Sequence, residues 1–264
     1  MVDHPQAGLH GSVLDRLGTL ITSGELGAGE VLRIEQLEDR FGVSRSVVRE
    51  AIRVLESMGM VTSRRRVGVT VAERARWNVF DPQIIGWRLD GPGRDEQLRS
   101  LGELRRGLEP VAAALAARRA TPAQCGALTG AVMEMAVHGR SGDLESYLTA
   151  DVLFHRTLLE ASGNEMMAAL SGVVAAVLAG RTHHHLMPAH PEPAAIRWHA
   201  EVAQAVQAGD ADAAERAMRD IVDEATRAML DGVDQHAGDE NGGGQNSVGG
   251  SAGTGSGSGS TSGA

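Results

Sequence analysis

Three arginines recur every four residues in one short stretch of the chain, at Arg45, Arg49 and Arg53. Residues four apart lie on one face of an α-helix, so three guanidinium groups would share a single exposed side. A guanidinium can bind a guanine edge or a phosphate through two parallel hydrogen bonds. The spacing therefore indicates nucleic-acid binding. Taken alone, it is also compatible with an ordinary solvated helix face.

A second group of residues has the chemistry of a metal site. Asp151 and His155 are four residues apart, which places a carboxylate and an imidazole on one helix face within reach of one ion. His199 follows on a later helix. The residues alone leave alternatives open: a surface hydrogen bond for the pair, and a satisfied or solvent-facing histidine for His199. Of the consecutive histidines 183–185, at most one can face inward, because neighbours on a helix point 100° apart.

The arginines belong to a helix that follows a tight turn. A first helix is predicted over Ile34–Phe41, and a turn at Gly42-Val43 separates it from a second helix over Ser44–Met58. Ser44 is predicted to be the N-cap, with its hydroxyl accepting a backbone N–H. The apolar residues of the second helix recur at three- and four-residue steps and are predicted to be buried: Val48, Ala51, Ile52 and Leu55.

A basic hairpin follows this pair of helices. Residues 61–64 and 67–71 alternate like two short strands, with Arg64, Arg65 and Arg66 at the turn before Gly68. A helix entered through a tight turn can place its N-terminus in the major groove, while a basic hairpin tip contacts the flanking backbone. Together, the two helices and the hairpin predict a domain that binds double-stranded DNA.

The distribution of charge agrees with this interpretation. The formal net charge of the whole chain is −9. Residues 1–76 nevertheless hold eleven arginines against ten acidic residues, and residues 44–66 hold six arginines against two glutamates. Nucleic-acid binding depends on where the charges lie, so the local basic region is compatible with DNA binding despite the negative net charge. Aromatic residues make up only 3%, which argues against a stacking surface for single strands.

Composition also limits the setting of the protein. The one cysteine, Cys125, excludes a disulfide framework and a cysteine-based zinc site within one chain, so a reducing cytoplasm is expected. We expect neither secretion nor a membrane span, because we find no charged region followed by an apolar run at the N-terminus and no apolar stretch of 18 residues.

The chain divides into four predicted parts. Residues 1–75 are predicted to form a winged helix-turn-helix domain that opens with a helix over 9–23. Residues 76–95 form a linker with a short helix around Pro82–Arg88. Residues 96–233 form an all-α antiparallel bundle, and residues 234–264, rich in Gly and Ser, are expected to be disordered. The fold class is mostly α with a small β-wing. The bundle helices are predicted at 96–119, 122–138, 143–161, 165–187, 192–208 and 210–231.

The stretch GVSRSVVREAIRVLESMGMVTSRRRVGVTV resembles the winged helix-turn-helix of the GntR family of bacterial transcription regulators, over residues 9–71. Members often carry a basic residue where this chain has Glu35, which cannot hold a phosphate; Arg33 is a candidate replacement. The resemblance implies that the second helix faces the operator with the wing beside it. With Arg33, the candidate DNA-binding residues are Ser44, Arg45, Ser46, Val47, Arg49, Arg64, Arg65, Arg66 and Gly68.

Residues 96–231 resemble the helical effector domain of the FadR subfamily within this family, through ELRRGLEPVAAALAARRAT, DVLFHRTLLEASGN and WHAEVAQAVQAGDADAAERAM. Many members hold a divalent metal with one Asp and three His, and the metal grips a carboxylate effector. The resemblance implies a zinc, nickel or manganese site at Asp151, His155 and His199. Ile221 stands where the last histidine is expected, and His185 is a conceivable replacement. Some members bind no metal.

Four residues are candidates for binding an effector: Arg105, Asn164, Arg181 and His185. For Arg105, a surface ion pair with a neighbouring glutamate is the alternative. The segment RWNVFDPQIIGWRL resembles the linker of FadR-type repressors that respond to sugar acids such as galactonate and gluconate. An aldonate would therefore suit the site.

The leading hypothesis is a homodimeric, ligand-responsive regulator, a repressor of a catabolic operon that binds a palindromic double-stranded operator and no membrane. A closer alternative is a metal-free regulator that binds a fatty acyl thioester or another organic acid. A remote alternative is a metal-dependent enzyme in which Asp151, His155 and His199 activate water. No general base stands at a defined spacing from these residues, and an enzyme would leave the helix-turn-helix unexplained.

Overall fold

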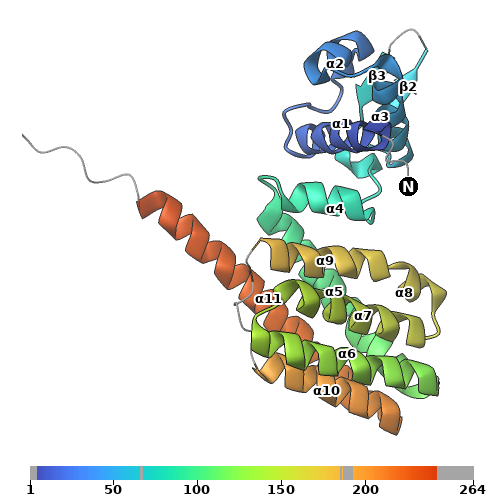
Figure 1. The fold of residues 1–264 in the computed structure, drawn as a ribbon, viewed down its shortest axis with the longest axis vertical. Coiled ribbons are helices and arrows are strands. Elements are labelled where there is room, and N and C mark those ends of the chain that lie inside the picture. Colours follow the sequence, from blue (N-terminus) through green and yellow to red (C-terminus); the bar gives the residue numbers. More distant parts are fainter. Residues whose placement is uncertain (1–4, 66–67, 185, 187–192, 243–264) are drawn as a thin grey trace, which may run out of the picture.

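The computed structural model describes residues 5–65, 68–184, 186 and 193–242. It contains helices throughout and one small three-stranded sheet (Figure 1). The sheet and the first three helices form an N-terminal body, a short helix follows, and the remaining helices form a bundle (Figure 1). The mostly-α fold class with a β-wing is confirmed.

The N-terminal body is a winged helix-turn-helix. The apolar faces of α1 and α3 pack together, and Leu17, Val48 and Leu55 are fully buried between them. Gly42 adopts the left-handed conformation (φ 65°) that ends the first helix of the motif, as a glycine does at low cost. The elements are α1 (Pro5–Thr22), β1 (Val31–Leu32), α2 (Ile34–Phe41), α3 (Arg45–Ser57), β2 (Val61–Arg64) and β3 (Gly68–Val71).

The wing is an antiparallel sheet in the order β1-β3-β2. Arg64 pairs with Gly68 at the end of the hairpin, and β1 adds to the other edge through Val31–Thr70 and Leu32–Val69. The sequence predicted the hairpin but not β1, because two residues are too few to show alternation.

A short helix, α4 (Pro82–Leu89), connects the two bodies. The helix begins with a proline, and the Asp81 carboxylate accepts a hydrogen bond from the Gln83 N–H at 2.9 Å. The sequence predicted a short helix around Pro82–Arg88. Ile84 and Trp87 belong to the core of the N-terminal body, whereas Ile85 and Leu89 belong to a core of the bundle. Opposite faces of one helix are therefore buried in two domains. A 3-10 turn, η1 (Arg74–Arg76), precedes α4.

The bundle contains seven helices within the described residues: α5 (Arg94–Arg119), α6 (Pro122–Ser141), α7 (Leu144–Ala161), α8 (Glu165–Ala169), α9 (Ser171–His183), α10 (Pro193–Ala208) and α11 (Ala211–Gly242). Helix α11 packs along α5, α6 packs on α7 and α10, and α9 lies against α7. The apolar core includes Met135, Phe154 and Met218.

Two predicted boundaries in the bundle are wrong. The helix predicted over 165–187 is two helices, α8 and α9, which meet at Leu170. Helix α11 continues to Gly242, so 234–242 is helical where the sequence predicted the start of a disordered tail. The rest of that tail, 243–264, lies outside the described residues.

The expectation that no apolar stretch of 18 residues occurs is also wrong. The segment Glu165–His183 is long and apolar enough to cross a membrane by composition. It spans the break between α8 and α9, and four of its residues are buried in bundle cores: Val173, Val174, Val177 and Leu178. Its apolar character is therefore explained by packing within the bundle.

Candidate nucleic-acid interface and metal centre

The outer face of α3 carries the three arginines that the sequence placed there. Arg45, Arg49 and Arg53 are all exposed, while the four apolar residues predicted to be buried lie in the core. Arg53 pairs with Glu50 of its own helix at 3.0 Å. Within the described residues Arg49 has no ion-pair partner, so its guanidinium is available to a ligand.

Arg45 is engaged from the neighbouring helix. Its Nη1 atom lies 3.0 Å from Glu35 Oε1 and 4.0 Å from Glu38 Oε2, both on α2. The side chains of Arg45 and Glu35 remain 50% and 66% exposed. The residue that departs from the expected basic pattern therefore neutralises one of the arginines on the strip.

The other candidate DNA-binding residues occupy the same side or the wing. Ser44 is at the N-cap position, but its hydroxyl contacts Ser46 Oγ at 2.9 Å and makes no cap hydrogen bond, which corrects the prediction. Val47 is half-buried and packs against the core. The exposed members are Arg33, Ser44, Ser46, Arg64, Arg65 and Gly68. Arg66 lies outside the described residues.

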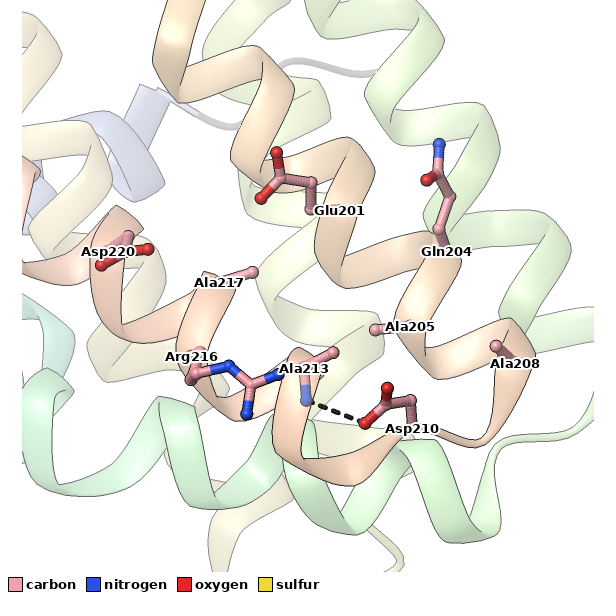
Figure 2. A pocket seen from close by; sticks show the side chains of 9 residues that line it. All are labelled: Glu201, Gln204, Ala205, Ala208, Asp210, Ala213, Arg216, Ala217 and Asp220. Atoms are coloured by element: carbon pink, nitrogen blue, oxygen red, sulfur yellow. Dashed lines mark hydrogen bonds between the residues drawn. The ribbon is translucent and has the colours of Figure 1, made fainter.

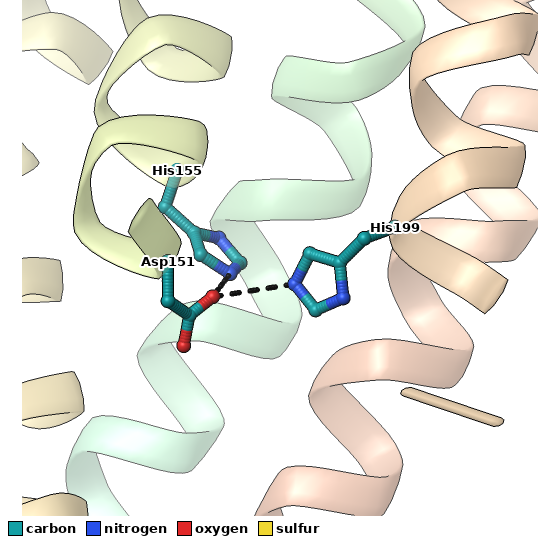
Figure 3. A group of neighbouring side chains, drawn as sticks. All are labelled: Asp151, His155 and His199. Carbon is teal, nitrogen blue, oxygen red and sulfur yellow. Dashed lines mark ion pairs between the residues drawn. The ribbon is translucent and has the colours of Figure 1, made fainter. Parts of the chain in front are cut away.

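The candidate metal ligands meet inside the bundle. Asp151 and His155 come from α7 and His199 from α10 (Figure 3). The Nε2 atoms of His155 and His199 each lie 3.3 Å from Asp151 Oδ1. One ligand atom from each residue falls within 4.8 Å of the others, and all three residues are buried. The surface hydrogen bond left open for Asp151 and His155 is thus excluded.

Each histidine turns its other ring nitrogen toward a fixed acceptor. His199 Nδ1 lies 2.7 Å from the carbonyl oxygen of Ala195, and His155 Nδ1 lies 2.7 Å from Glu109 Oε2. When a metal is bound, a proton on each Nδ1 would leave the Nε2 lone pair free for the ion. Metal-binding histidines are oriented by partners of this kind. The ring of Phe154 lies edge-on to both imidazoles, with centroids 5.6 and 4.9 Å away.

Glu109 and Arg105 form a buried ion pair behind His155. The two side chains are 0% and 1% exposed, and Arg105 contacts Glu109 through Nε and Nη2. The alternative of a surface ion pair is therefore wrong. Burial raises the pKa of Glu109, but Arg105 and His155 outweigh it and lower the pKa to about 2. The sequence analysis missed Glu109 as a site residue, although its four-residue spacing from Arg105 was a usable signal.

In the metal-free protein His155 and the carboxylates of Glu109 and Asp151 hold one another in their charged forms. Burial opposes charge on His155, yet the Glu109 and Asp151 carboxylates raise its pKa to about 9. Burial likewise opposes charge on Asp151, and the adjacent His155 and His199 side chains hold its pKa well below the usual range. A divalent ion can take the place of these protons, because both kinds of ligand bind metal without them.

The donor set fits a divalent metal. Asp151 Oδ1, His155 Nε2 and His199 Nε2 are buried and lack any properly oriented hydrogen-bond partner among the described residues. One carboxylate and two imidazoles suit zinc, nickel or manganese. Ile221 is buried in the apolar core, so it adds no ligand, and His185 lies outside the described residues.

Two of the other effector candidates differ in availability. Arg181, half-buried on α9, has an Nε atom with no hydrogen-bond partner among the described residues. Asn164 caps α8 by accepting the Met166 N–H at 3.0 Å, so its carbonyl group is already used. Sequence reasoning missed Tyr147, which is buried one turn before Asp151. Burial and then Asp151 raise the pKa of Tyr147, and Arg181 opposes them.

A hollow on the bundle surface lies apart from this cluster. It is formed by α10 and α11 and is lined by alanines and charged side chains (Figure 2). None of the three candidate ligands lines it, and Asp210 at its edge accepts the Ala213 N–H at 2.9 Å to cap α11. The candidate metal ligands lie in the interior of the bundle and not in this hollow.

The exposed arginine strip and the wing define a winged helix-turn-helix protein, here joined to an all-helical second domain. Residues 9–71 match the family model described as bacterial regulatory proteins, gntR family, and residues 100–224 match the FCD domain. The chain belongs to the GntR family of bacterial regulatory proteins, with an FCD domain. It is a transcription regulator.

Two relatives from Escherichia coli K12 are similar over most of the chain. The galactonate operon transcriptional repressor is 27% identical over 208 residues, covering 78% of this chain and 90% of that protein. The putative L-lactate dehydrogenase operon regulatory protein is 33% identical over 217 residues, covering 80% and 82%. Among solved structures, Lar of Listeria monocytogenes has the same fold at 20% identity, with a TM-score of 0.54 and coverage of 88% of this chain and 99% of that one.

Proposed function

We propose that the protein is a cytoplasmic, homodimeric repressor of a catabolic operon, released from its operator by a small carboxylate such as an aldonate. In this proposal a divalent metal at Asp151, His155 and His199 holds the effector. One observation carries it: three buried ligand atoms converge within 4.8 Å in the domain attached to a DNA-binding motif.

The DNA-binding half acts through α3 and the wing. The N-terminal end of α3 enters the major groove, where Arg49 and Arg45 reach base edges or phosphates and Ser46 adds a hydroxyl. Arg64 and Arg65 at the hairpin contact the flanking backbone. A palindromic operator takes one recognition helix from each subunit, which is why we propose a dimer.

The sensing half acts through the buried cluster. A bound divalent ion supplies a positive centre that attracts a carboxylate, and three protein ligands leave coordination positions for it. Glu109 and the Ala195 carbonyl orient the two imidazoles, and the packed bundle excludes water. Arg105 Nη1 and Arg181 Nε, two guanidinium atoms without a hydrogen-bond partner among the described residues, are the candidate donors for the carboxylate.

The names of two relatives support a hydroxy carboxylate as the effector, a class to which the proposed aldonate belongs. One relative is named for the galactonate operon and another for L-lactate dehydrogenase, and both of those acids carry hydroxyl groups as well as a carboxylate. A fatty acyl thioester has no free carboxylate for the metal, so a metal-free protein would favour that alternative.

The effector must change the placement of the two DNA-binding domains. It can do so only through different affinities for two arrangements of the bundle. Helix α4 is the natural connection, since Ile84 and Trp87 are buried in one domain and Ile85 and Leu89 in the other. A shift of α9, which contacts α4 and carries Arg181, would reach the DNA-binding domain through it.

An electrophoretic shift assay with the region upstream of the gene tests the first half of the proposal. Unchanged migration at micromolar protein and low salt would contradict it. Metal analysis and thermal shift with galactonate, gluconate and L-lactate test the second half. We expect about one metal ion per chain and a carboxylate stabilisation that needs the metal. A metal-free protein whose melting ignores added zinc, nickel and manganese favours the acyl thioester.

A further inference from the structure

The arginines of the recognition helix differ in what already holds them. The Nη1 atom of Arg45 lies 3.0 Å from the Glu35 carboxylate across the turn and 4.0 Å from the Glu38 carboxylate. Arg53 pairs only within its own helix, and Arg49 has no ion-pair partner among the described residues. Arg45 is therefore the member of the strip whose charge is opposed by a different helix.

The Glu35 carboxylate is exposed and stays charged. Its own backbone N–H, at the start of α2, and the guanidinium groups of Arg45 and Arg33 lower its pKa. At neutral pH it presents to Arg45 the same negative charge that a DNA phosphate would present. A duplex that approaches α3 must compete with a carboxylate already in place.

We propose that Glu35 is a specificity-determining residue, which withholds Arg45 from the phosphate contacts that bind any duplex. This inference rests on the proposed operator binding and adds to it how the chain distinguishes its operator from other DNA. The role is one of positioning and charge competition, because Glu35 acts through Arg45.

The competition affects two kinds of contact differently. Affinity for arbitrary DNA comes from cations that neutralise phosphates and release counterions, so a cation already paired with a carboxylate adds less to it. Moving Arg45 onto a phosphate also leaves Glu35 unpaired beside the negative backbone. A guanine edge presents neutral acceptors, and a guanidinium has five N–H donors. Arg45 can therefore contact guanine while it keeps Glu35.

The test compares two duplexes of equal length, the operator and a scrambled version, by fluorescence anisotropy between 50 and 200 mM salt. The full chain is used, as wild type and as Glu35→Gln. Glu38→Gln is the matched control, because it makes the same charge change on the same helix at 4.0 Å from Arg45. Both side chains lie outside the core, and a melting curve confirms that each variant folds.

We expect Glu35→Gln to tighten binding to the scrambled duplex about fivefold at 50 mM salt and to the operator less than twofold. Freeing one cation should make the slope of log binding constant against log salt concentration steeper by about 0.9 for the scrambled duplex. Glu38→Gln should change both affinities less than twofold. In an Arg45→Ala background, Glu35→Gln should no longer tighten scrambled binding.

Four outcomes overturn the inference. Equal tightening on both duplexes means that only net charge matters. An equal effect of Glu38→Gln, or an effect that persists without Arg45, removes the ion pair from the explanation. Loss of operator affinity alone makes Glu35 a reader of bases such as cytosine. A wild type that binds neither duplex contradicts the proposed function instead, so the two failures are distinct.

Discussion

The two charged regions of this protein use the same side chains in opposite surroundings. On α3, Arg45 pairs with a carboxylate and remains 50% exposed; in the bundle, Arg105 pairs with Glu109 and is 1% exposed. An exposed pair contributes little and exchanges partners readily, whereas breaking a buried pair leaves an uncompensated charge. The surface strip is suited to exchanging its partners for DNA, and the buried cluster is suited to holding a fixed geometry for a ligand.

The largest expected effect is on the buried pair. Glu109→Gln leaves Arg105 without its carboxylate and takes the negative charge away from His155, so we expect a loss of about 3–5 kcal/mol in the free energy of unfolding. Denaturant unfolding of the metal-free protein measures it. Glu50→Gln, which breaks the exposed pair with Arg53, should change stability by less than about 0.5 kcal/mol. Equal effects of the two substitutions would refute the contrast between the regions.

The next effect is the pH dependence of the metal-free protein. The pKa of His155 is about 9 in the fold and near 6.5 in the unfolded chain, so the folded state binds the proton more tightly. Its contribution, about 3 kcal/mol, is fully present below pH 6.5 and is lost as pH rises through 9. Melting in a chelator should therefore fall between pH 6.5 and 9.5.

The metal-loaded protein is the control for this profile. Metal binding requires neutral imidazole, so metal affinity rises over the same pH range and the melting temperature should hold or increase. If the metal-free melting temperature stays constant between pH 6.5 and 9.5, His155 is not protonated in the fold and the assignment of charge in the cluster is wrong.

A smaller effect is expected on the surface strip. Arg49→Ala removes an exposed guanidinium without a partner among the described residues, so the fold should keep its stability. Operator affinity should drop by about 1–3 kcal/mol, or roughly 5- to 150-fold, if Arg49 makes a bidentate contact. Anisotropy titration measures the affinity and sedimentation measures the assembly. Unchanged affinity would remove Arg49 from the interface.

The smallest expected effect is a difference in stability loss between two N-cap substitutions. The Thr121 hydroxyl accepts the Gln124 N–H at 3.3 Å in a capping box, while the Ser44 hydroxyl caps nothing. Thr121→Ala should cost about 1 kcal/mol in thermal unfolding, and Ser44→Ala less than about 0.5 kcal/mol. Ser44→Ala can still weaken operator binding. A larger stability loss at Ser44 than at Thr121 would show that Ser44 caps α3 in solution.

The sequence predicted the DNA-binding domain well, because its signals are local. Ile34, Leu37 and Phe41 mark one helix by spacing alone, and the buried face of α3 follows from the same rule. The short helix predicted around Pro82–Arg88 is α4, and Pro82 stands at its first position. The break between α8 and α9 falls at Leu170, and the nearest glycine, Gly172, lies inside α9. Apolar residues continue across the break, so their spacing did not separate the two helices.

Contacts between distant residues were harder to predict. Asp151 and His155 share a helix turn, so their proximity follows from spacing, but the approach of His199 came only from resemblance. Glu109 meets His155 because the register of α5 against α7 places it there, and periodicity does not report register. The ion pair between Glu35 and Arg45 likewise depends on the angle between two helices.

The most direct test of the division of labour measures metal content and operator affinity in one preparation of His155→Ala. We predict loss of the metal, an operator dissociation constant within threefold of wild type, and no response to a carboxylate that releases the wild type. His199→Gln serves as a second variant if His155→Ala does not fold. Loss of operator binding together with the metal, or a carboxylate response that persists without it, would contradict a separate sensor in the bundle.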